Sequence, residues 1–188
     1  MPSTKLSLKD KKSLLTTARH AIQYGLAYQK APHMELDKYT PELQAIGASF
    51  VTLKESNQLR GCIGTLEAKL PLIQDVAEHA FAAAFNDPRF PPVTHIEEPV
   101  IHISISILSQ AHPMTFNSEQ GLLAQLQVGK DGLIFQYKNH NSTFLPSVWD
   151  QIQTPAEFLN HLKVKAGLTQ DFWSDEIKIS RYYCDHID

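Results

Sequence analysis

The stretch from Leu59 to Thr65, which reads LRGCIGT, holds the residues of this chain with the clearest chemical potential. Cys62 is a candidate catalytic nucleophile, and Arg60 stands two positions before it. Alternate side chains of a strand share a face, so Arg60 and Cys62 should point the same way, and the arginine would stabilise the thiolate. Gly61 and Gly64 weaken a strand, which indicates a bulge or a close approach by another backbone or a ligand. Gly64 should leave a gap on the face of Cys62.

The alternative is that Cys62 only packs, because free cysteine is among the most buried residue types. The other cysteine, Cys184, is distant, so this chain alone builds neither an iron–sulphur cluster nor a cysteine-rich zinc site. A nucleophilic Cys62 would also need a base. Three histidines in the middle of the chain are candidates for that base, although their spacing is not diagnostic: His79, His95 and His102.

Composition excludes several classes of protein. The chain has 188 residues, 43% of them hydrophobic and 20% charged, which suits one domain or a domain with a small lobe. A net charge of −3 does not favour nucleic-acid binding, which usually requires a basic surface. The N-terminus lacks the apolar core of a signal peptide, and no apolar run approaches the roughly 20 residues of a membrane helix. We therefore expect a cytoplasmic protein that does not bind a membrane and for which nucleic acid is the least favoured partner.

The motif should be the second strand of a hairpin. Residues 48–53 predict the first strand, and the polar stretch from Glu55 to Gln58 predicts the turn. A helix should follow, with Pro71 at its first position and its end near Asn86. The surroundings of Cys62 depend on the hairpin register, because a slip of one residue would turn its side chain to the opposite face.

Residues 86–92 (NDPRFPP) cannot continue the helix, because three prolines fix the backbone and remove donors. A rigid loop presents functional groups well, so Asp87 and Arg89 are candidate ligand-binding residues. We expect Arg60 and Arg89 to approach one anion-sized site near the motif. The alternative is that Asp87 and Arg89 pair with each other or cap the helix.

The rest of the chain mixes helix and strand signals. Ser7 should cap a first helix, and Thr154 followed by Pro155 marks a later one. Residues 100–108 alternate isoleucine with histidine and serine, which predicts a strand with one polar face. The fold class should be α+β: a mainly antiparallel sheet flanked by helices, with a smaller second lobe.

Several stretches, taken together with LRGCIGT, resemble the AMMECR-type domain family, known in bacteria and archaea as component A of the AmmeMemoRadiSam system. They occur in family order and span almost the whole chain, so residues 1–188 are interpreted as one AMMECR-type domain. Many family members carry Gln at the position of Ser147, so any role of the glutamine amide is in doubt in this chain. The stretches are Asn86–Val93, Ile103–Ser109, Gly129–Leu133, Leu145–Trp149 and Lys165–Leu168.

The resemblance implies a cleft near the motif and two companions, a Memo-like protein and a radical S-adenosylmethionine (SAM) protein; it supplies no reaction. Lys130 and Lys165 lie in the family-like stretches and join Arg60, Arg89 and the glycines as candidate residues for a small anionic ligand. The alternative is that these cations make structural pairs with three acidic residues: Asp87, Glu97 and Asp131.

The favoured hypothesis is a ligand-binding or catalytic cleft at LRGCIGT that acts with those companions. One alternative is a cysteine-nucleophile enzyme for group transfer, and others are a protein adaptor or an RNA-binding module. Two scattered cysteines and nine unclustered histidines give no metal-ligand spacing, so we expect no metal or cofactor held by this chain.

Overall fold

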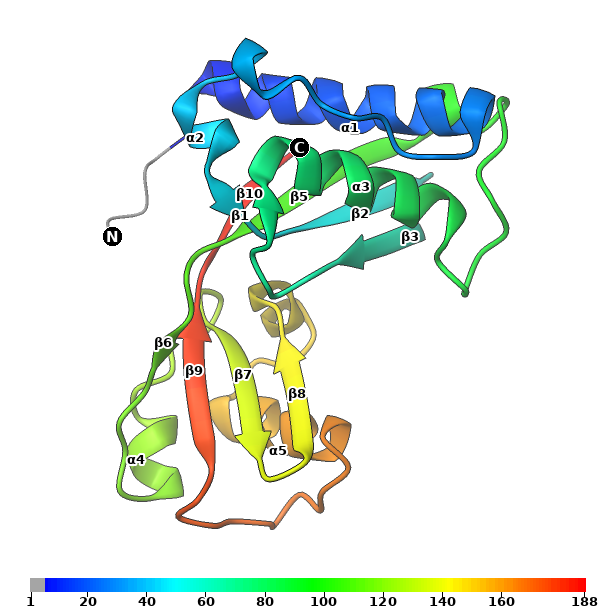
Figure 1. Ribbon diagram of the computed structural model, residues 1–188. Coiled ribbons are helices and arrows are strands. Elements are labelled where there is room, and N and C mark those ends of the chain that lie inside the picture. Colours follow the sequence, from blue (N-terminus) through cyan, green and yellow to red (C-terminus); the bar gives the residue numbers. More distant parts are fainter. Residues whose placement is uncertain (1–5) are drawn as a thin grey trace. The chain divides into compact units, whose positions relative to one another are not determined.

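The structure is a computed structural model that describes residues 6–188. It divides into two compact units, each described here by itself. The first comprises the chain up to Leu108 together with Asp185–Asp188, and the second comprises Ser109–Cys184 (Figure 1).

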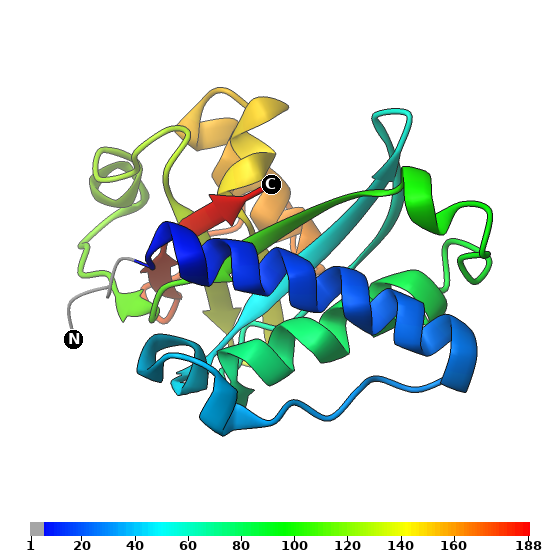
Figure 2. The same cartoon turned by 90° about the horizontal axis from the view of Figure 1, so that it is seen from above.

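The first unit is a four-stranded sheet in the order β10-β5-β2-β3, with helices on one face. Figures 1 and 2 show α1 and α3 lying side by side over one face of this sheet. The elements are α1 Leu8–Tyr28, α2 Pro41–Gln44, β1 Ile46–Gly47, β2 Ser49–Glu55, β3 Gln58–Gly64, β4 Leu70–Pro71, α3 Leu72–Phe85, β5 His102–Leu108 and β10 Cys184–Ile187, with short 3₁₀ helices at Leu36–Lys38 and Glu98–Val100.

Helix α1 begins where the sequence predicts. Ser7 Oγ accepts a hydrogen bond from Asp10 N at 3.1 Å, and Asp10 Oδ2 accepts one from Ser7 N at 3.1 Å. This reciprocal capping box satisfies two of the amide groups that a helix N-terminus leaves unpaired. Leu14, Ala18 and Ile22 then recur at helical spacing and are fully buried against the rest of the unit.

The predicted hairpin is confirmed. β2 and β3 pair antiparallel around the two-residue turn Ser56–Asn57, where both residues have positive φ, as tight hairpin turns require. The polar face predicted for residues 100–108 is also confirmed: Ile103 and Ile105 are in the core, and β5 pairs with β2 along its whole length. Pro71 was predicted as the first residue of this helix and is instead the N-cap of α3, so the helix begins one residue later, at Leu72. The helix ends at Phe85, with Asn86 as its C-cap.

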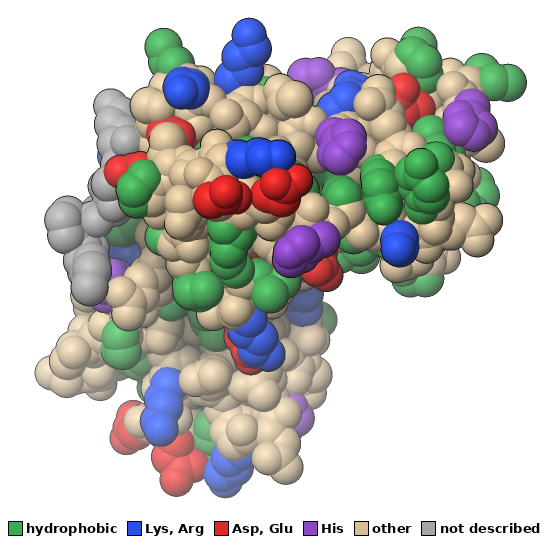
Figure 3. All heavy atoms as spheres, turned by 45° about the horizontal axis from the view of Figure 1, so that its top comes forward, with side chains coloured by type: hydrophobic (Ala, Val, Ile, Leu, Met, Phe, Trp, Pro, Cys, Tyr) green, Lys and Arg blue, Asp and Glu red, His purple; other side chains and the backbone are tan. Residues whose placement is uncertain are grey.

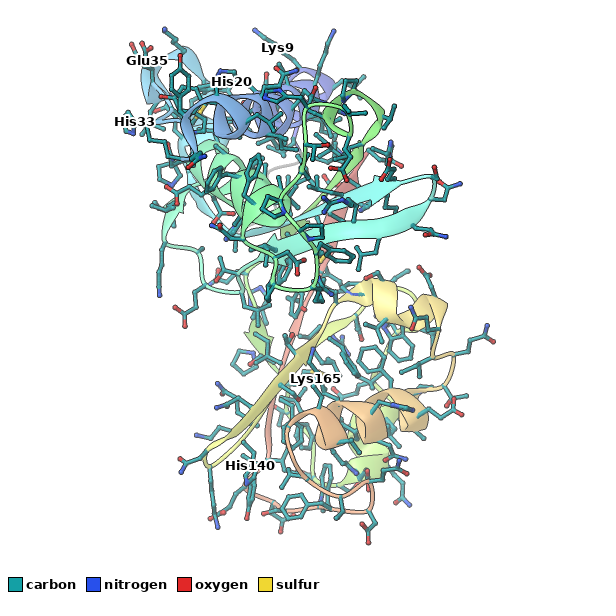
Figure 4. The ribbon with its side chains drawn as sticks, turned by 90° about the vertical axis from the view of Figure 1, so that its right-hand side faces the viewer. Lys9, His20, His33, Glu35, His140 and Lys165 are labelled. Atoms are coloured by element: carbon teal, nitrogen blue, oxygen red, sulfur yellow. The ribbon has the colours of Figure 1, made fainter. Side chains whose placement is uncertain are left out.

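The second unit is a four-stranded sheet in the order β6-β9-β7-β8. Helix α5 begins at the predicted cap, where Thr154 accepts a hydrogen bond from Glu157 N, and it packs on one face of this sheet (Figure 4). An aromatic pair, Trp149 and Phe158, stacks in the core with ring centroids 4.0 Å apart. The elements are β6 His112–Pro113, α4 Glu119–Leu123, β7 Gly132–Tyr137, β8 His140–Phe144, a 3₁₀ helix at Pro146–Asp150, α5 Pro155–Lys165 and β9 Lys178–Tyr182.

Antiparallel sheets flanked by helices make the fold α+β, as predicted. Both units consist of a sheet with helices packed against it, and each has its own hydrophobic core. The LRGCIGT stretch belongs entirely to the first unit.

Candidate functional site

Cys62 lies in β3, the edge strand of the first sheet, opposite Thr52 of β2. Its backbone groups point away from β2: Cys62 N donates to Asp87 Oδ2 at 2.9 Å, and Cys62 O accepts from Arg89 Nη2 at 3.2 Å. Thr52 and Cys62 are therefore a non-hydrogen-bonded pair, in which opposing side chains come closest. Accordingly, the Thr52 hydroxyl lies 3.3 Å from the Cys62 sulphur.

Asp87 and Arg89 form the structure that holds this strand edge, and we call the pair the edge clamp. Arg89 binds Asp87 through two parallel hydrogen bonds, Nε to Oδ1 at 2.9 Å and Nη2 to Oδ2 at 2.7 Å. The hydrogen bond from Arg89 holds the pKa of the Asp87 carboxyl well below its usual range despite burial, and the Cys62 N–H adds to the effect. The clamp satisfies edge-strand groups that would otherwise remain unpaired.

The proline loop places both residues of the clamp. Asn86 ends α3, and Phe90 N donates to Asp87 O at 3.1 Å in a tight turn. Val93 N then donates to Ala84 O at 2.9 Å, which ties the far end of the loop back to the helix. The loop is therefore fixed at both ends, as the three prolines predict.

Arg60 lies at a bulge in β3. Gly61 pairs with Leu53 of β2, and Leu59 pairs with Lys54, the residue after Leu53. Arg60 therefore has no partner in β2. Its guanidinium binds Glu97 Oε1 at 2.8 Å and the Pro91 carbonyl at 2.9 Å. The hydrogen bond from Arg60, joined by those from Thr94, lowers the pKa of Glu97 to about 2.

Two expectations about the arginines are therefore wrong. Arg60 does not serve the Cys62 thiol, since the bulge interrupts the simple alternation and its side chain binds the loop instead. Arg60 and Arg89 also do not share an open anion site, since each guanidinium has its own carboxylate. The alternative, structural pairing with Asp87 and Glu97, describes both arginines.

The cation near the sulphur is Arg89 instead. Its own pKa is raised, mainly by the hydrogen bond to Asp87, and its Nη2 donates to the Cys62 carbonyl oxygen at 3.2 Å. Arg89 keeps 54% of its side chain exposed, so part of the guanidinium stays accessible beside Cys62. A neighbouring cation of this kind stabilises a thiolate.

The two motif glycines serve close packing. A Cβ on Gly61 would lie 2.1 Å from the carbonyl oxygen of Ala83, so α3 approaches the strand at this point. A Cβ on Gly64 would lie 2.4 Å from the Phe50 ring, so the expected gap is filled by Phe50. The bulge and the close backbone approach predicted from the glycines are both present, and ligand binding by either glycine stays a prediction.

The face opposite the helices carries a short row of small polar side chains. The register aligns Cys62 with Thr52, and Thr52 with Ser104 of β5. Sequence reasoning missed Thr52, because its position opposite Cys62 depends on a bulge whose place no sequence pattern specifies. Counting back from the Ser56–Asn57 turn would have given the correct partner only with that extra residue included.

The histidines do not complete a catalytic pair with Cys62. His79 Nδ1 lies 3.1 Å from Asp75 Oδ2 on the same helix, and His102 pairs with Lys54 across the sheet. Among residues 6–188 no hydrogen bond joins Cys62 to a histidine; its side-chain contact is with Thr52. The structure therefore brings no imidazole to the thiol as a general base.

Lys130 and Lys165 belong to the second unit, apart in the chain from the edge clamp. Lys165 Nζ donates to Thr143 O at 3.0 Å and lies over the Phe144 ring, beside strand β8 (Figure 4). Lys130 lies in the turn before β7, where Asp131 is fully buried and pairs with Arg181 rather than with Lys130. Binding of an anionic ligand by either lysine stays a prediction.

The comparison with protein families decides the identity of the chain. A family model described as AMMECR1 matches residues 15–187. The chain belongs to the AMMECR1 family.

Similar proteins match most of the chain. Protein MJ0810 of Methanocaldococcus jannaschii is 36% identical over 185 residues, which covers 94% of this chain and 89% of that protein. A protein of Sulfolobus acidocaldarius is 37% identical over 179 residues, which covers 91% and 78%. The crystal structure of the uncharacterised protein PH0010 from Pyrococcus horikoshii matches with a TM-score of 0.87 at 30% identity, over 96% of this chain and 92% of that one.

The described part of the chain lacks two further features. Residues 6–188 contain no helix that is both long and apolar enough to cross a bilayer. The same residues contain no group of three or more His, Cys, Asp or Glu side chains placed to hold a metal ion.

Proposed function

We propose that this AMMECR1-family member is a cytoplasmic ligand-binding protein whose site centres on the Cys62 thiol, and that it works with a Memo-like protein and a radical SAM protein. The observation that carries the proposal is the edge clamp. Two side chains from one rigid loop fix both backbone groups of a single residue, Cys62. The clamp therefore fixes the position of Cys62 on the sheet edge, which is what a site centred on this residue requires.

The surroundings of Cys62 favour binding over independent catalysis. The sulphur contacts a hydroxyl, and the nearby charged group is the Arg89 guanidinium, which stabilises a thiolate but cannot accept a proton. Acyl transfer by a cysteine usually needs an adjacent base, so a partner or the ligand itself would have to supply one. The companions provide a natural source of the chemistry that this chain lacks.

A second candidate function, group transfer through a Cys62 thioester or related adduct, is favoured by one observation. The partly exposed Arg89 guanidinium binds the Cys62 carbonyl oxygen, and a cation beside a cysteine favours the thiolate, which is its nucleophilic form. The two functions differ in what Cys62→Ser does. Serine keeps the hydrogen bond to Thr52 and supports binding, but it loses almost all nucleophilic transfer at neutral pH.

The test combines purified partners with that substitution. A Memo-like protein and a radical SAM protein are mixed with this chain at about 10 μM each and examined by native mass spectrometry. A complex with either protein, formed equally by wild type and by Cys184→Ser, supports the partnership; no complex with either contradicts it. Complexes that also survive Cys62→Ser favour the binding role, whereas a covalent mass adduct found on wild type and absent from Cys62→Ser favours group transfer.

A further inference from the structure

A concave site lies in the first unit, between the proline loop and the helices. A pocket of about 570 Å³ opens between the C-terminal end of α1, the C-terminal half of α3 and the loop that follows α3. On the face drawn in Figure 3, hydrophobic side chains gather over this end of the helices, close to a histidine. Its volume is in the range of small-molecule sites.

The floor of the pocket is aromatic. Phe81 and Phe85 of α3 line it, with ring centroids 5.1 Å apart and planes tilted by 41°. Gly25 of α1 makes room for these rings, because a Cβ there would lie 2.4 Å from the Phe85 ring and 2.7 Å from the Phe81 ring. A flat aromatic ligand can stack on such a surface at little conformational cost.

Within residues 6–188, the rim of the pocket is polar and holds none of the permanently charged residue types. The side-chain amides of Gln29 and Asn86 and the imidazole of His95 line it, and each amide offers both donors and an acceptor. Among the described residues that line the pocket, none is Lys, Arg, Asp or Glu. A charged ligand would lose hydration without gaining a partner of opposite charge, so the rim selects against it.

The pocket is also built in advance of any ligand. Val93 N donates to Ala84 O at 2.9 Å, and the Thr94 hydroxyl donates to Glu97 Oε2 at 2.8 Å, so the loop wall is tied to the helix and to its own continuation. A fixed wall lowers the entropy cost of binding.

We propose that this pocket binds a small, neutral, planar heteroaromatic molecule, of which a nucleobase is the simplest example. The ring stacks on Phe81 and Phe85, and its hydrogen-bonding edge meets the amides of Gln29 and Asn86. This inference is independent of the function proposed for Cys62, because it uses none of the residues of that site.

The test is an NMR titration of the isotope-labelled full chain with three probes: adenine, benzoate and cyclohexanecarboxamide. We expect adenine to shift the amide signals of Asn86, Thr94 and His95 saturably, with a dissociation constant below about 1 mM. Benzoate keeps the flat ring but carries a charge, and cyclohexanecarboxamide keeps an amide without a flat ring, so both should bind about tenfold more weakly. Equal binding of all three probes, or adenine shifts that never saturate, would overturn the proposal.

Two variants locate the binding. Gly25→Ala pushes the phenylalanine rings into the cavity and should weaken adenine binding about tenfold, and Asn86→Leu removes one amide and should weaken it about fivefold. Lys30→Ala, next to Gln29 but outside the lining, is the matched control and should leave binding unchanged. Circular dichroism checks folding, and if Gly25→Ala does not fold, Asn86→Leu decides. Adenine binding that is unaltered in the folded variants would show that the pocket is not the site.

Discussion

The two cysteines of this chain are both free and half-buried, but their surroundings differ. Cys62 has its backbone held by the edge clamp, its sulphur beside the Thr52 hydroxyl and the Arg89 guanidinium nearby. Partial burial raises the pKa of the Cys184 thiol to about 12. Polar and charged groups lie around Cys62, whereas burial keeps the Cys184 thiol neutral.

The difference teaches that exposure alone does not predict what a cysteine can do. A thiol reacts through its thiolate, so the nearby charge and the local polarity decide reactivity when accessibility is similar. In this chain those features come from the loop that carries Asp87 and Arg89, not from the strand that carries Cys62. Each prediction below changes one side of the comparison and leaves the other as a control.

The largest expected effect comes from removing the edge clamp. Asp87→Ala leaves the Cys62 N–H and the Arg89 guanidinium without their carboxylate, and we expect the free energy of unfolding to fall by about 3 kcal/mol. Urea unfolding followed by far-UV circular dichroism measures the change. Asp37→Ala, an exposed aspartate of the same unit, is the matched control and should change stability little.

Fluorescence adds a test of location for this variant. Trp149 and Trp173 are the two tryptophans of the chain and both lie in the second unit, so their fluorescence reports that unit. An Asp87→Ala protein with the same urea midpoint as wild type by circular dichroism would show that the clamp contributes nothing to stability.

The next effect is a dependence on acid. The pKa of Glu97 is lowered to about 2 by Arg60, so its pairing stabilises the fold above the ordinary glutamate pKa and is lost as pH falls from about 4.5 toward 2. We expect this group to account for about 2 kcal/mol of the stability lost over that window. Unfolding in urea at pH 5 and pH 3 should show a smaller loss for Glu97→Gln than for wild type. Parallel losses in the two proteins would count against the ion pair.

The smallest effect concerns the stability of serine and alanine variants, whose order should be opposite at the two cysteine positions. At position 62, serine should be at least as stable as alanine, because its hydroxyl can replace the contact with Thr52. At position 184, alanine should be more stable than serine by about 1 kcal/mol, because burial penalises an added hydroxyl. Thermal unfolding of the four variants checks this, and the same order at both positions would remove the contrast between the two surroundings.

Local sequence signals predicted the elements better than the contacts between them. The Ser7 cap, the hairpin, the alternation of β5 and the start of α5 were all read correctly, because each depends on neighbouring residues. The position of Arg60 was misread, because one extra residue in β3 redirects its side chain and only the folded sheet shows where that residue is inserted.

The candidate site was predicted in part for the same reason. The sequence marked Cys62, Asp87 and Arg89 as candidate site residues, and the structure brings these three together. It did not show that Asp87 and Arg89 act on the backbone of Cys62, because hydrogen bonds to backbone groups leave no trace in side-chain patterns. Thr52 was missed because strand register is a property of the pair of strands.

The most direct test of the account is a comparison of thiol reactivity in the folded protein. Cys62 and Cys184 are alkylated with a limiting amount of iodoacetamide at pH 7.5, and mass spectrometry measures the rate at each residue. We expect Cys62 to react at least about tenfold faster than Cys184, and Arg89→Gln to slow Cys62 while leaving Cys184 unchanged. In urea the two rates should become similar. Equally slow labelling of both cysteines in the folded wild type would contradict the account, because Cys62 would then be a packing residue like any other buried thiol.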